Sequence, residues 1–389
     1  MSDRIHKISA AFTEAFGGKP EVWVRAPGRV DLMGSHTDYN LGYVLTLPIS
    51  RDTVIAARPR PDGIISLRSL ALDAEDCFRI DSIESAPTGS WASYIRGVAS
   101  VLQKEGFALT ALDGIIDTTI PLRSGLSSSA ALECAFALLL RTLGNWSLDP
   151  VRMAQLCQRA ENEFAGVSCG ILDQYTSCLG QAGCALLLDC RDLSSRAINL
   201  ASDIRVVICD TRSRRELAGS EYGRRRADCE LGARVMGVPA LRDSSLQQLE
   251  DHREAFPELA VRRCRFILEE NSRVLALAEA LPAGNREAIT ALCAGSFRGA
   301  DELYEIVSSS MREMMDAMLS APGAIGARQA GAGFGGCMVA FVDAGVVGSF
   351  SEAVCSQYRK ATGIDAQVYA VDAAEGAGVM TPDSMEVSL

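Results

Sequence analysis

The segment Pro121–Glu133, with the sequence PLRSGLSSSAALE, places the strongest constraint on how this chain folds. A strand-like segment, 114–120, precedes it, and an almost wholly apolar run, 130–140, follows it. This order predicts a strand, a tight loop and a buried helix. Serine hydroxyls and free backbone N–H groups then meet at the positive end of the helix dipole, an arrangement that suits a polyphosphate.

The serine loop by itself leaves two interpretations open. It lacks the lysine of the G-x-x-x-x-G-K-[ST] pattern, so it is not a Walker A loop. The plainer interpretation is an ordinary helix that follows a turn and is capped by a serine. The other is a phosphate-binding loop, and deciding between them requires other parts of the chain.

Charge and cysteine content limit the classes of partner and compartment. The chain of 389 residues carries 38 basic and 49 acidic side chains, a net charge of −11, which argues against nucleic acid or an anionic membrane as its main partner. Its 13 cysteines form no C-x-x-C pair and it has three histidines, so neither a zinc site nor a disulfide scaffold is expected. The N-terminus has mixed charges without an apolar core, and no apolar run is long enough to span a membrane. We therefore predict a cytoplasmic protein.

Further polar or glycine-rich stretches follow predicted strands and helices. Ser35–Asn40 lies between two strand-like segments, and its hydrogen-bonding side chains suit either a hydroxyl-rich ligand or a polar turn. Asp173 follows the glycine-containing loop 166–170 and is a candidate base or metal neighbour, or simply a helix cap. The arginine run 224–226 is typical of a solvated helical face. Four glycines within 331–336 indicate a close approach of the backbone to a ligand or to another segment.

The chain is long enough for two domains that share one cleft. Strand-like segments dominate its first half, whereas 241–320 is rich in predicted helices. The shift lies near residues 180–200, and we predict an N-terminal domain at 1–190 and a C-terminal domain at 191–389.

Three stretches together carry a family resemblance. Pro27–Gly34, Gly125–Leu132 and Gly331–Cys337 resemble the three motifs of the GHMP small-molecule kinases, the group that includes galactokinase, homoserine kinase, mevalonate kinase and phosphomevalonate kinase. Within that group, His36–Asn40 and the stretch 160–174 resemble galactokinase signatures, as does 220–226. The similarity runs in order from about residue 20 to 343.

The resemblance implies an α+β fold of two domains, with the active site in the cleft between them. It implies ATP-dependent phosphorylation of a monosaccharide, foremost D-galactose, at its anomeric hydroxyl, with Mg²⁺ as the cofactor of ATP. The small partners would then be a sugar and ATP, and the protein a monomer or weak oligomer.

The resemblance also assigns roles to residues. Arg29 and Asp173 match the catalytic pair at the transferred phosphoryl group, and Ser129 and Glu161 match the Mg²⁺ ligands. Sugar contacts correspond to Ser35, His36, Asp38, Gly170, Asp173 and Tyr222. Nucleotide contacts correspond to Trp91, Tyr94, Ser124, Gly125, Leu126, Ser127, Ser128 and Ser129. Whether Asp173 removes the proton or mainly orients the hydroxyl stays open, because a loose phosphoryl-transfer transition state demands little of a base.

The chain departs from the galactokinase pattern at the sugar site. Ser35 stands where galactokinases usually carry a glutamate associated with the C6 hydroxyl, and Asp31 stands where they usually carry asparagine. The alternative sugars are therefore L-arabinose, galacturonate or an amino sugar. If galactose is not the substrate, Ser35→Glu is expected to raise kcat/KM for galactose. A non-catalytic sugar sensor on the same fold is a further alternative, against which the intact serine loop argues.

Overall fold

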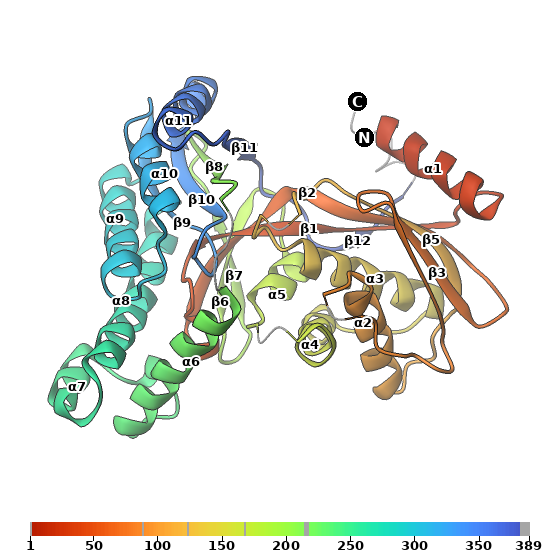
Figure 1. Cartoon of the computed structure of the whole chain (residues 1–389), viewed down its shortest axis with the longest axis horizontal. Coiled ribbons are helices and arrows are strands. Elements are labelled where there is room, and N and C mark those ends of the chain that lie inside the picture. The colour runs from red at the N-terminus through yellow and green to blue at the C-terminus, as the bar shows by residue number, and fades with distance from the viewer. Residues whose placement is uncertain (1, 88, 123, 167–168, 214–217, 382–389) are drawn as a thin grey trace.

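A computed structural model describes residues 2–87, 89–122, 124–166, 169–213 and 218–381. Among these residues, no helix combines the length and the apolar character that crossing a bilayer requires. Two mixed layers of sheet and helix lie side by side in Figure 1, which bears out the predicted α+β class.

The larger sheet is formed mainly by the first half of the chain. In the described part of the chain it has eight strands, with the order β12-β1-β2-β5-β3-β4 and with β6 and β7 attached through β2. Its strands are β1 (Val22–Met33), β2 (Tyr43–Pro59), β3 (Ile64–Ser69), β4 (Ala74–Arg79), β5 (Leu112–Thr118), β6 (Cys184–Asp189), β7 (Ser195–Asn199) and β12 (Gly378–Val379). The strand-like segment that follows Ser35–Asn40 is part of one long strand, β2. The same strand pairs with β6 through 43–46 and with β5 through 53–59.

Four helices cover one face of this sheet, because their apolar faces pack against the inward-facing residues of β1, β2, β3 and β5. They are α2 (Ala92–Lys104), α3 (Ser128–Gly144), α4 (Pro150–Ala160) and α5 (Leu172–Leu179), and the π-helical turn η2 (Glu161–Ala165) continues α4. The apolar run 130–140 forms the central part of α3 and is buried, as its composition predicts. The short 3₁₀ helices among the described residues are η1 (Asp38–Asn40), η3 (Leu241–Asp243), η4 (Arg253–Ala255) and η5 (Ala344–Val346).

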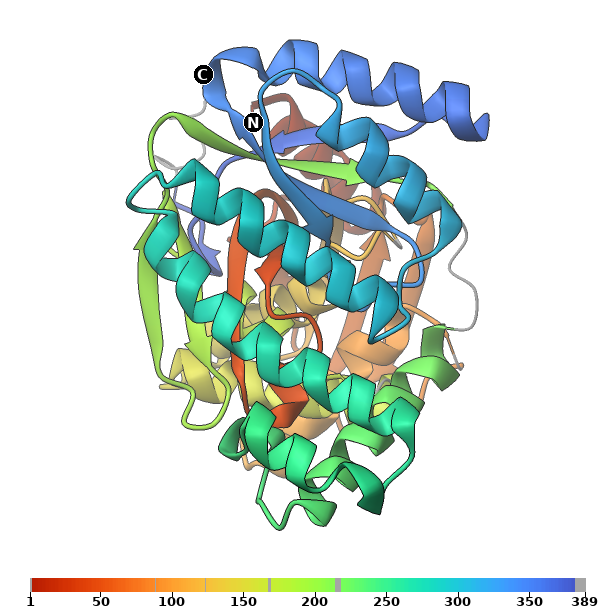
Figure 2. The ribbon, with the colours of Figure 1, turned by 90° about the vertical axis from the view of Figure 1, so that its left-hand side faces the viewer.

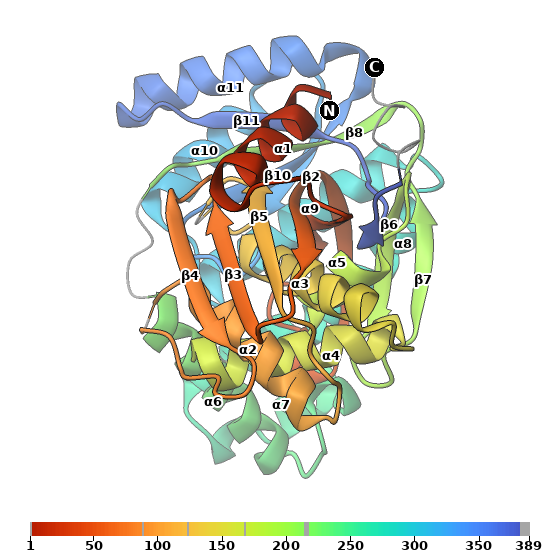
Figure 3. The same cartoon turned by 90° about the vertical axis from the view of Figure 1, so that its right-hand side faces the viewer.

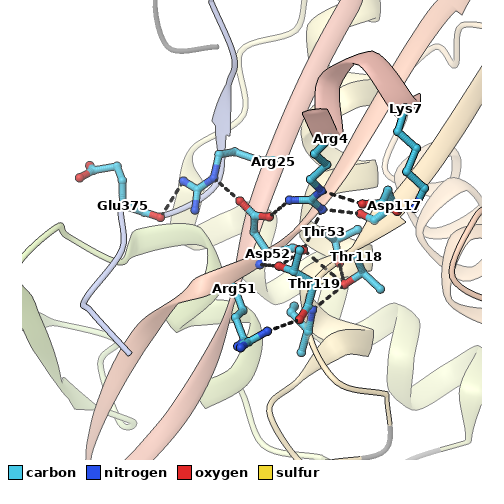
Figure 4. A network of polar contacts seen from close by, with 11 residues as sticks. Arg4, Lys7, Arg25, Arg51, Asp52, Thr53, Asp117, Thr118, Thr119 and Glu375 are labelled. Carbon is cyan, nitrogen blue, oxygen red and sulfur yellow. Dashed lines mark hydrogen bonds and ion pairs between the residues drawn. The ribbon is translucent and has the colours of Figure 1, made fainter. Parts of the chain in front are cut away.

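Helix α1 (Ser2–Phe16) covers the opposite face of the sheet, as Figure 3 shows. Ile8 and Phe12 pack there against strand residues. Arg4 fixes the start of the helix, since its guanidinium contacts Asp52 at 2.5 Å and Asp117 at 2.6 Å (Figure 4). Each of these carboxylates has a second cationic partner, Arg25 for Asp52 and Lys7 for Asp117.

The second half of the chain builds the smaller sheet, with the order β11-β8-β10-β9. The strands of this sheet are β8 (Ile204–Asp210), β9 (Ala324–Gln329), β10 (Cys337–Asp343) and β11 (Gln367–Val371). The helices of this half are α6 (Ala218–Val235), α7 (Leu246–Asp251), α8 (Glu258–Ala280), α9 (Arg286–Glu302), α10 (Ser309–Leu319) and α11 (Val347–Thr362). Helices α10 and α11 pack on one face. On the other side α8 and α9 run beside each other, in teal and cyan in Figure 2.

One hydrophobic core joins the two sheets. Val30 and Leu45 of the larger sheet share it with Ile208 and Phe341 of the smaller sheet and with Leu277 of α8. The proposed boundary at residues 190/191 stays a prediction. Strands β7 and β12 lie after it in sequence and pair with β6 and β1 of the larger sheet.

Candidate active site

The serine loop turns sharply between β5 and α3. Gly125 has a φ of +90° and Ser127 a φ of +59°, and Ser127 occupies the N-cap position of α3. The Ser127 hydroxyl makes no capping bond to the helix; it donates instead to Asp173 Oδ2 at 2.5 Å. The plainer interpretation of a serine-capped helix is therefore wrong. A helix N-terminus without a side-chain cap presents N–H groups that suit an anion.

Two of the predicted nucleotide contacts turn their side chains away from the loop's open side. The Ser124 hydroxyl donates to the backbone carbonyl of Pro121 at 2.7 Å. Leu126 is fully buried in the core that joins the two sheets. Its carbonyl accepts from the backbone N–H of Arg29, and a Cβ on Gly28 would lie 2.6 Å from that oxygen. Gly28 thus permits the close approach of β1 to the loop.

Arg29 and Asp173 form the ion pair that the resemblance predicts. Arg29 lies on β1 and is buried, and Asp173 lies in the first turn of α5. The Arg29 guanidinium donates to Asp173 Oδ1 from Nε at 2.7 Å and to the carbonyl of Gly125 from Nη1 at 2.8 Å. One arginine therefore connects the acidic side chain to the serine loop.

Glu161 stands at the end of α4, close to the same ion pair. Its carboxylate accepts from the Gln174 amide at 2.6 Å and from the Cys169 thiol at 3.2 Å. Burial raises the pKa of Glu161, as does the Asp173 charge, while hydrogen bonds from Cys169, Gln174 and Ser129 lower it. The structure thus brings the predicted ligands Ser129 and Glu161 together.

A second buried carboxylate lies behind Glu161. Gln174 donates the same amide nitrogen to Glu133 Oε2 at 2.9 Å, and Glu133 is fully buried on α3. Burial and the Glu161 charge raise the pKa of Glu133 well above its usual range. Sequence reasoning missed Glu133, Gln174 and Cys169. A charged residue within the apolar run 130–140 was the signal available for Glu133.

The donor set around Glu161 fits a hard cation. A serine hydroxyl and one carboxylate are oxygen ligands of the kind that Mg²⁺ accepts together with substrate phosphates. Across the described residues, no group of three or more His, Cys, Asp or Glu side chains is placed to hold a metal ion. Substrate phosphates and water would complete the coordination of a Mg²⁺ ion held by Ser129 and Glu161.

His36 and Asp38 lie on the turn after β1, with η1 holding Asp38. His36 Nε2 lies 3.0 Å from the carbonyl of Ala332 and Nδ1 lies 3.0 Å from the Tyr39 hydroxyl. Because a carbonyl only accepts, Nε2 carries the hydrogen. Burial lowers the pKa of His36 to about 4, so the ring is neutral at neutral pH.

Gly170 leaves the space that Asp38 occupies. A Cβ built on Gly170 would lie 1.6 Å from Asp38 Oδ2. Burial raises the pKa of Asp38 to about 6, with smaller contributions of the same sign from Asp173 and Asp31. The three carboxylates face a common space.

Helix α6 brings Tyr222 from the second half of the chain to this place. The Tyr222 ring lies 5.1 Å from the His36 ring and 5.4 Å from the Tyr39 ring, between centroids. Burial raises the Tyr222 pKa well above its usual range, and the charge of Asp38 adds to this. The arginine run 224–226 was predicted to lie on a solvated helical face, and Arg224 is exposed as predicted. Arg225 is buried instead, and its guanidinium donates to the carbonyl of Tyr304.

The glycine-rich stretch Gly331–Cys337 approaches another chain segment closely. Gly331, Gly333, Gly335 and Gly336 all have positive φ, and a Cβ on Gly333 would lie 2.6 Å from the carbonyl of Ile306. Ala332 receives the hydrogen bond from His36. The close approach to another chain segment is thus found at Gly333. Gly331 and Ala332 line the pocket described next, and an approach to a ligand stays a prediction.

One pocket of about 1230 Å³ collects these groups between the two halves of the chain. Trp91 and Tyr94 at the start of α2 line it, together with Arg226 and Glu230 of α6. Of the predicted site residues, those that line it are Arg29, Ser35, His36, Asp38, Trp91, Tyr94, Gly125, Ser127, Ser128, Ser129, Glu161, Gly170, Asp173 and Tyr222.

Comparisons with known proteins agree with this geometry. Residues 10–59 match the galactokinase galactose-binding signature, 93–181 the GHMP kinases N terminal domain and 277–360 the GHMP kinases C terminal domain. The galactokinases of Roseiflexus sp. (strain RS-1) and Chloroflexus aurantiacus are each 41% identical to this chain over 377 residues, which is 96% of either sequence.

Solved structures agree as well. The crystal structure of Lactococcus lactis galactokinase complexed with galactose superposes with a TM-score of 0.91 at 31% identity, covering 95% of this chain and 98% of that one. The Streptococcus pneumoniae phosphomevalonate kinase complex, at 13% identity and a TM-score of 0.62 over 90% of this chain and all of that one, shares the fold. The chain belongs to the galactokinase family of the GHMP kinases.

Proposed function

We propose that this enzyme transfers the γ-phosphoryl group of ATP to the anomeric hydroxyl of D-galactose and forms α-D-galactose 1-phosphate. The observation that carries the proposal is the junction of Arg29, Asp173 and Ser127. Arg29 and Ser127 both donate hydrogen bonds to the Asp173 carboxylate, and Ser127 stands at the N-terminus of α3, which has no side-chain cap. Identity of 41% with curated galactokinases supports galactose as the sugar.

The serine loop binds the phosphates of ATP. Gly125 brings the backbone close, and Ser128 and Ser129 contribute the first N–H groups of α3, where the helix dipole favours negative charge. Ser124 and Leu126 support the loop through the backbone rather than by side-chain contact. Trp91 and Tyr94 line the pocket near the start of α2 and offer aromatic surface to the adenine.

Ser129 and Glu161 hold the Mg²⁺ that accompanies ATP. Bound there, the cation neutralises charge on the phosphate oxygens. Gln174 and Cys169 orient the Glu161 carboxylate through hydrogen bonds, and Gln174 is itself anchored to Glu133.

Asp173 and Arg29 act on the reacting atoms. Asp173 accepts the hydrogen of the anomeric hydroxyl and so orients its oxygen toward the γ-phosphoryl group. Arg29 and Ser127 hold the Asp173 carboxylate in place. The Arg29 guanidinium also stabilises charge that develops during transfer.

The sugar lies against His36, Asp38, Gly170 and Tyr222, with Ser35 nearby. Asp38 in its ionised form accepts hydrogen bonds from ring hydroxyls, and Gly170 leaves room for it. The Tyr222 ring closes the site from α6. In this proposal the enzyme binds galactose and ATP as its small-molecule partners. It acts in the cytoplasm as a monomer or weak oligomer.

A sugar panel with ADP release as the readout tests this function. We expect turnover with galactose that requires Mg²⁺, and little turnover with D-glucose. Asp173→Asn is expected to abolish it, whereas Asp301→Asn, which removes an outlying partner of Arg312, serves as a matched control with unchanged rates. No ADP release with galactose from folded enzyme, or faster turnover of L-arabinose or galacturonate, would contradict the proposal.

A further inference from the structure

A chain of hydrogen bonds runs from α6 to the glycine-rich stretch and passes through the His36 ring. The Cys229 thiol and the Tyr304 hydroxyl lie 3.4 Å apart, and the Tyr304 and Tyr39 hydroxyls lie 2.7 Å apart. The Tyr39 hydroxyl contacts His36 Nδ1, and His36 Nε2 contacts the Ala332 carbonyl, both at 3.0 Å. Residues from distant parts of the sequence therefore form one continuous chain.

Most of this chain is shielded from water. Tyr304, which follows the end of α9, is fully buried, and His36 and Cys229 are at most 4% exposed. The Tyr304 ring lies 5.0 Å from the His36 ring and 4.6 Å from the ring of Phe266 on α8, between centroids. Polar groups at such depth need protein partners, so each member of the chain depends on its neighbours.

The acceptor at the end of the chain decides the direction of every hydrogen bond in it. Because the Ala332 carbonyl only accepts, His36 Nε2 carries the hydrogen, and in the neutral ring Nδ1 is left as an acceptor. Tyr39 then donates its one hydrogen to Nδ1, so its oxygen accepts from Tyr304, whose own oxygen accepts from the Cys229 thiol. All the hydrogens point toward the glycine-rich stretch, and each bond strengthens the next.

Both ring nitrogens of His36 are thus occupied by the protein. A sugar hydroxyl would bond to either nitrogen only by breaking one of these contacts, and what the ring holds is the carbonyl of Ala332, which lines the pocket. The glycine-rich stretch has a second tie to the segment after α9, since the backbone N–H of Phe334 donates to the carbonyl of Ile306 at 2.7 Å. The His36 ring therefore helps to fix one wall of the pocket.

We propose that Tyr39 and Tyr304 are positioning residues for the sugar site. They hold the His36 ring in the orientation in which its Nε2–H group ties the glycine-rich stretch, Gly331–Cys337, to the turn after β1. Tyr304 lies 265 residues from Tyr39 in sequence, so the contact between their hydroxyls also joins the two halves of the chain at the pocket. The inference rests on the proposed function, which places the sugar against this wall.

Nitrogen-15 NMR of the histidine rings tests the hydrogen-bond chain without any substrate. The protein has three histidines, and the His36 ring is the one whose signals persist in both His6→Gln and His252→Gln. In the wild type at neutral pH we expect a neutral ring with hydrogen on Nε2 and with Nδ1 as a hydrogen-bonded acceptor. Tyr39→Phe is expected to move the Nδ1 signal toward that of an unbonded ring nitrogen, and Tyr304→Phe to move it less in the same direction.

Three NMR results would overturn the proposal. They are a charged His36 ring in the wild type at neutral pH, a wild-type ring with its hydrogen on Nδ1, and an Nδ1 signal that stays in place in Tyr39→Phe. The first two need no variant, so they hold even if a substitution prevents folding.

Kinetics separates positioning from a merely structural role. Tyr358→Phe is the matched control, because the Tyr358 hydroxyl is also buried and donates to the carbonyl of Thr211 at 3.0 Å. All three phenylalanine variants lose one hydroxyl and are expected to have lower unfolding midpoints. Only Tyr39→Phe and Tyr304→Phe are expected to raise KM for galactose, by about five-fold, with kcat and KM for ATP within about two-fold of wild type.

The double variant Tyr39→Phe/Tyr304→Phe tests whether one tyrosine acts through the other. Since Tyr304 reaches His36 Nδ1 through the Tyr39 hydroxyl, adding Tyr304→Phe to Tyr39→Phe is expected to raise KM for galactose no further. Effects that multiply, an unchanged KM in both single variants, or an equal rise in Tyr358→Phe would overturn the proposal. A wild type with the expected His36 spectrum but no turnover of galactose refutes the proposed function instead.

Discussion

Gly170→Ala is the substitution whose effect follows most directly from the structure. The added Cβ would lie 1.6 Å from Asp38 Oδ2 and 2.4 Å from Asp38 Cγ. Since a carbon and an oxygen tolerate about 3.3 Å, the carboxylate has to withdraw by more than about 1.5 Å. Asp38 is buried and lies in the proposed sugar subsite.

The loss is expected in sugar binding rather than in ATP binding. A hydrogen bond to a charged acceptor contributes about 1.5–3 kcal/mol, so losing one or two lowers kcat/KM for galactose by roughly 100-fold. Steady-state kinetics with galactose varied at saturating ATP measures this, and KM for ATP is expected to stay within about two-fold because the serine loop is untouched.

Gly348→Ala is the matched control. Gly348 lies within α11, and a Cβ built there meets nothing within 4 Å. Alanine in a helix is favoured over glycine by about 0.5–1 kcal/mol, so this variant is expected to be slightly more stable and kinetically normal. If Gly170→Ala folds and keeps the wild-type KM for galactose, the placement of the sugar against Asp38 is refuted.

Three further predictions concern charge. Because burial raises the Asp38 pKa to about 6, the folded chain holds this proton more tightly than the unfolded chain, and stability is lost as pH rises from about 4 through 6. Asp38→Asn is then expected to be inactive yet up to about 3 kcal/mol more stable at pH 7 in urea unfolding, and equal stability there would contradict the burial argument. Asp173→Asn is expected to lower kcat by about 100-fold or more and also to lower the unfolding midpoint, because the buried Arg29 loses its ion-pair partner, and a kcat near wild type removes Asp173 from the reaction. Arg4→Met is expected to cost about 2–3 kcal/mol in the free energy of unfolding, since Asp52 and Asp117 keep only their second partners, and a change under about 0.5 kcal/mol would show that α1 docks through Ile8 and Phe12 alone.

Local patterns in the chain were sufficient for many of its elements. The strand-like segment 114–120 and the apolar run 130–140 form β5 and the central part of α3 as predicted, because the tight loop between them marks where each ends. No strand was predicted at β4, β7, β9, β11 or β12. Exposed residues alternate along β4 and prevail in β7, so neither carries a strong apolar signal.

The site was predictable only where a motif named its residues. The motifs placed Arg29, Asp173 and the serine loop in one site, and the structure puts them in contact. The hydrogen-bond chain behind His36 was out of reach, because Tyr304 lies 265 residues after Tyr39 and belongs to no local pattern. The hydrogen bond from the Ser127 hydroxyl to Asp173 could not be predicted either. Ser127 has a positive φ, and no sequence pattern in the serine loop indicates that backbone conformation.

Phosphorus NMR of the product tests the central claim most directly. The enzyme is incubated with D-galactose, ATP and Mg²⁺, and the coupling of the new phosphorus signal to sugar protons locates the phosphate. The account predicts a single product with the phosphate on the anomeric oxygen in the α configuration. A phosphate on the C6 oxygen, or inorganic phosphate released without any sugar phosphate, would contradict it.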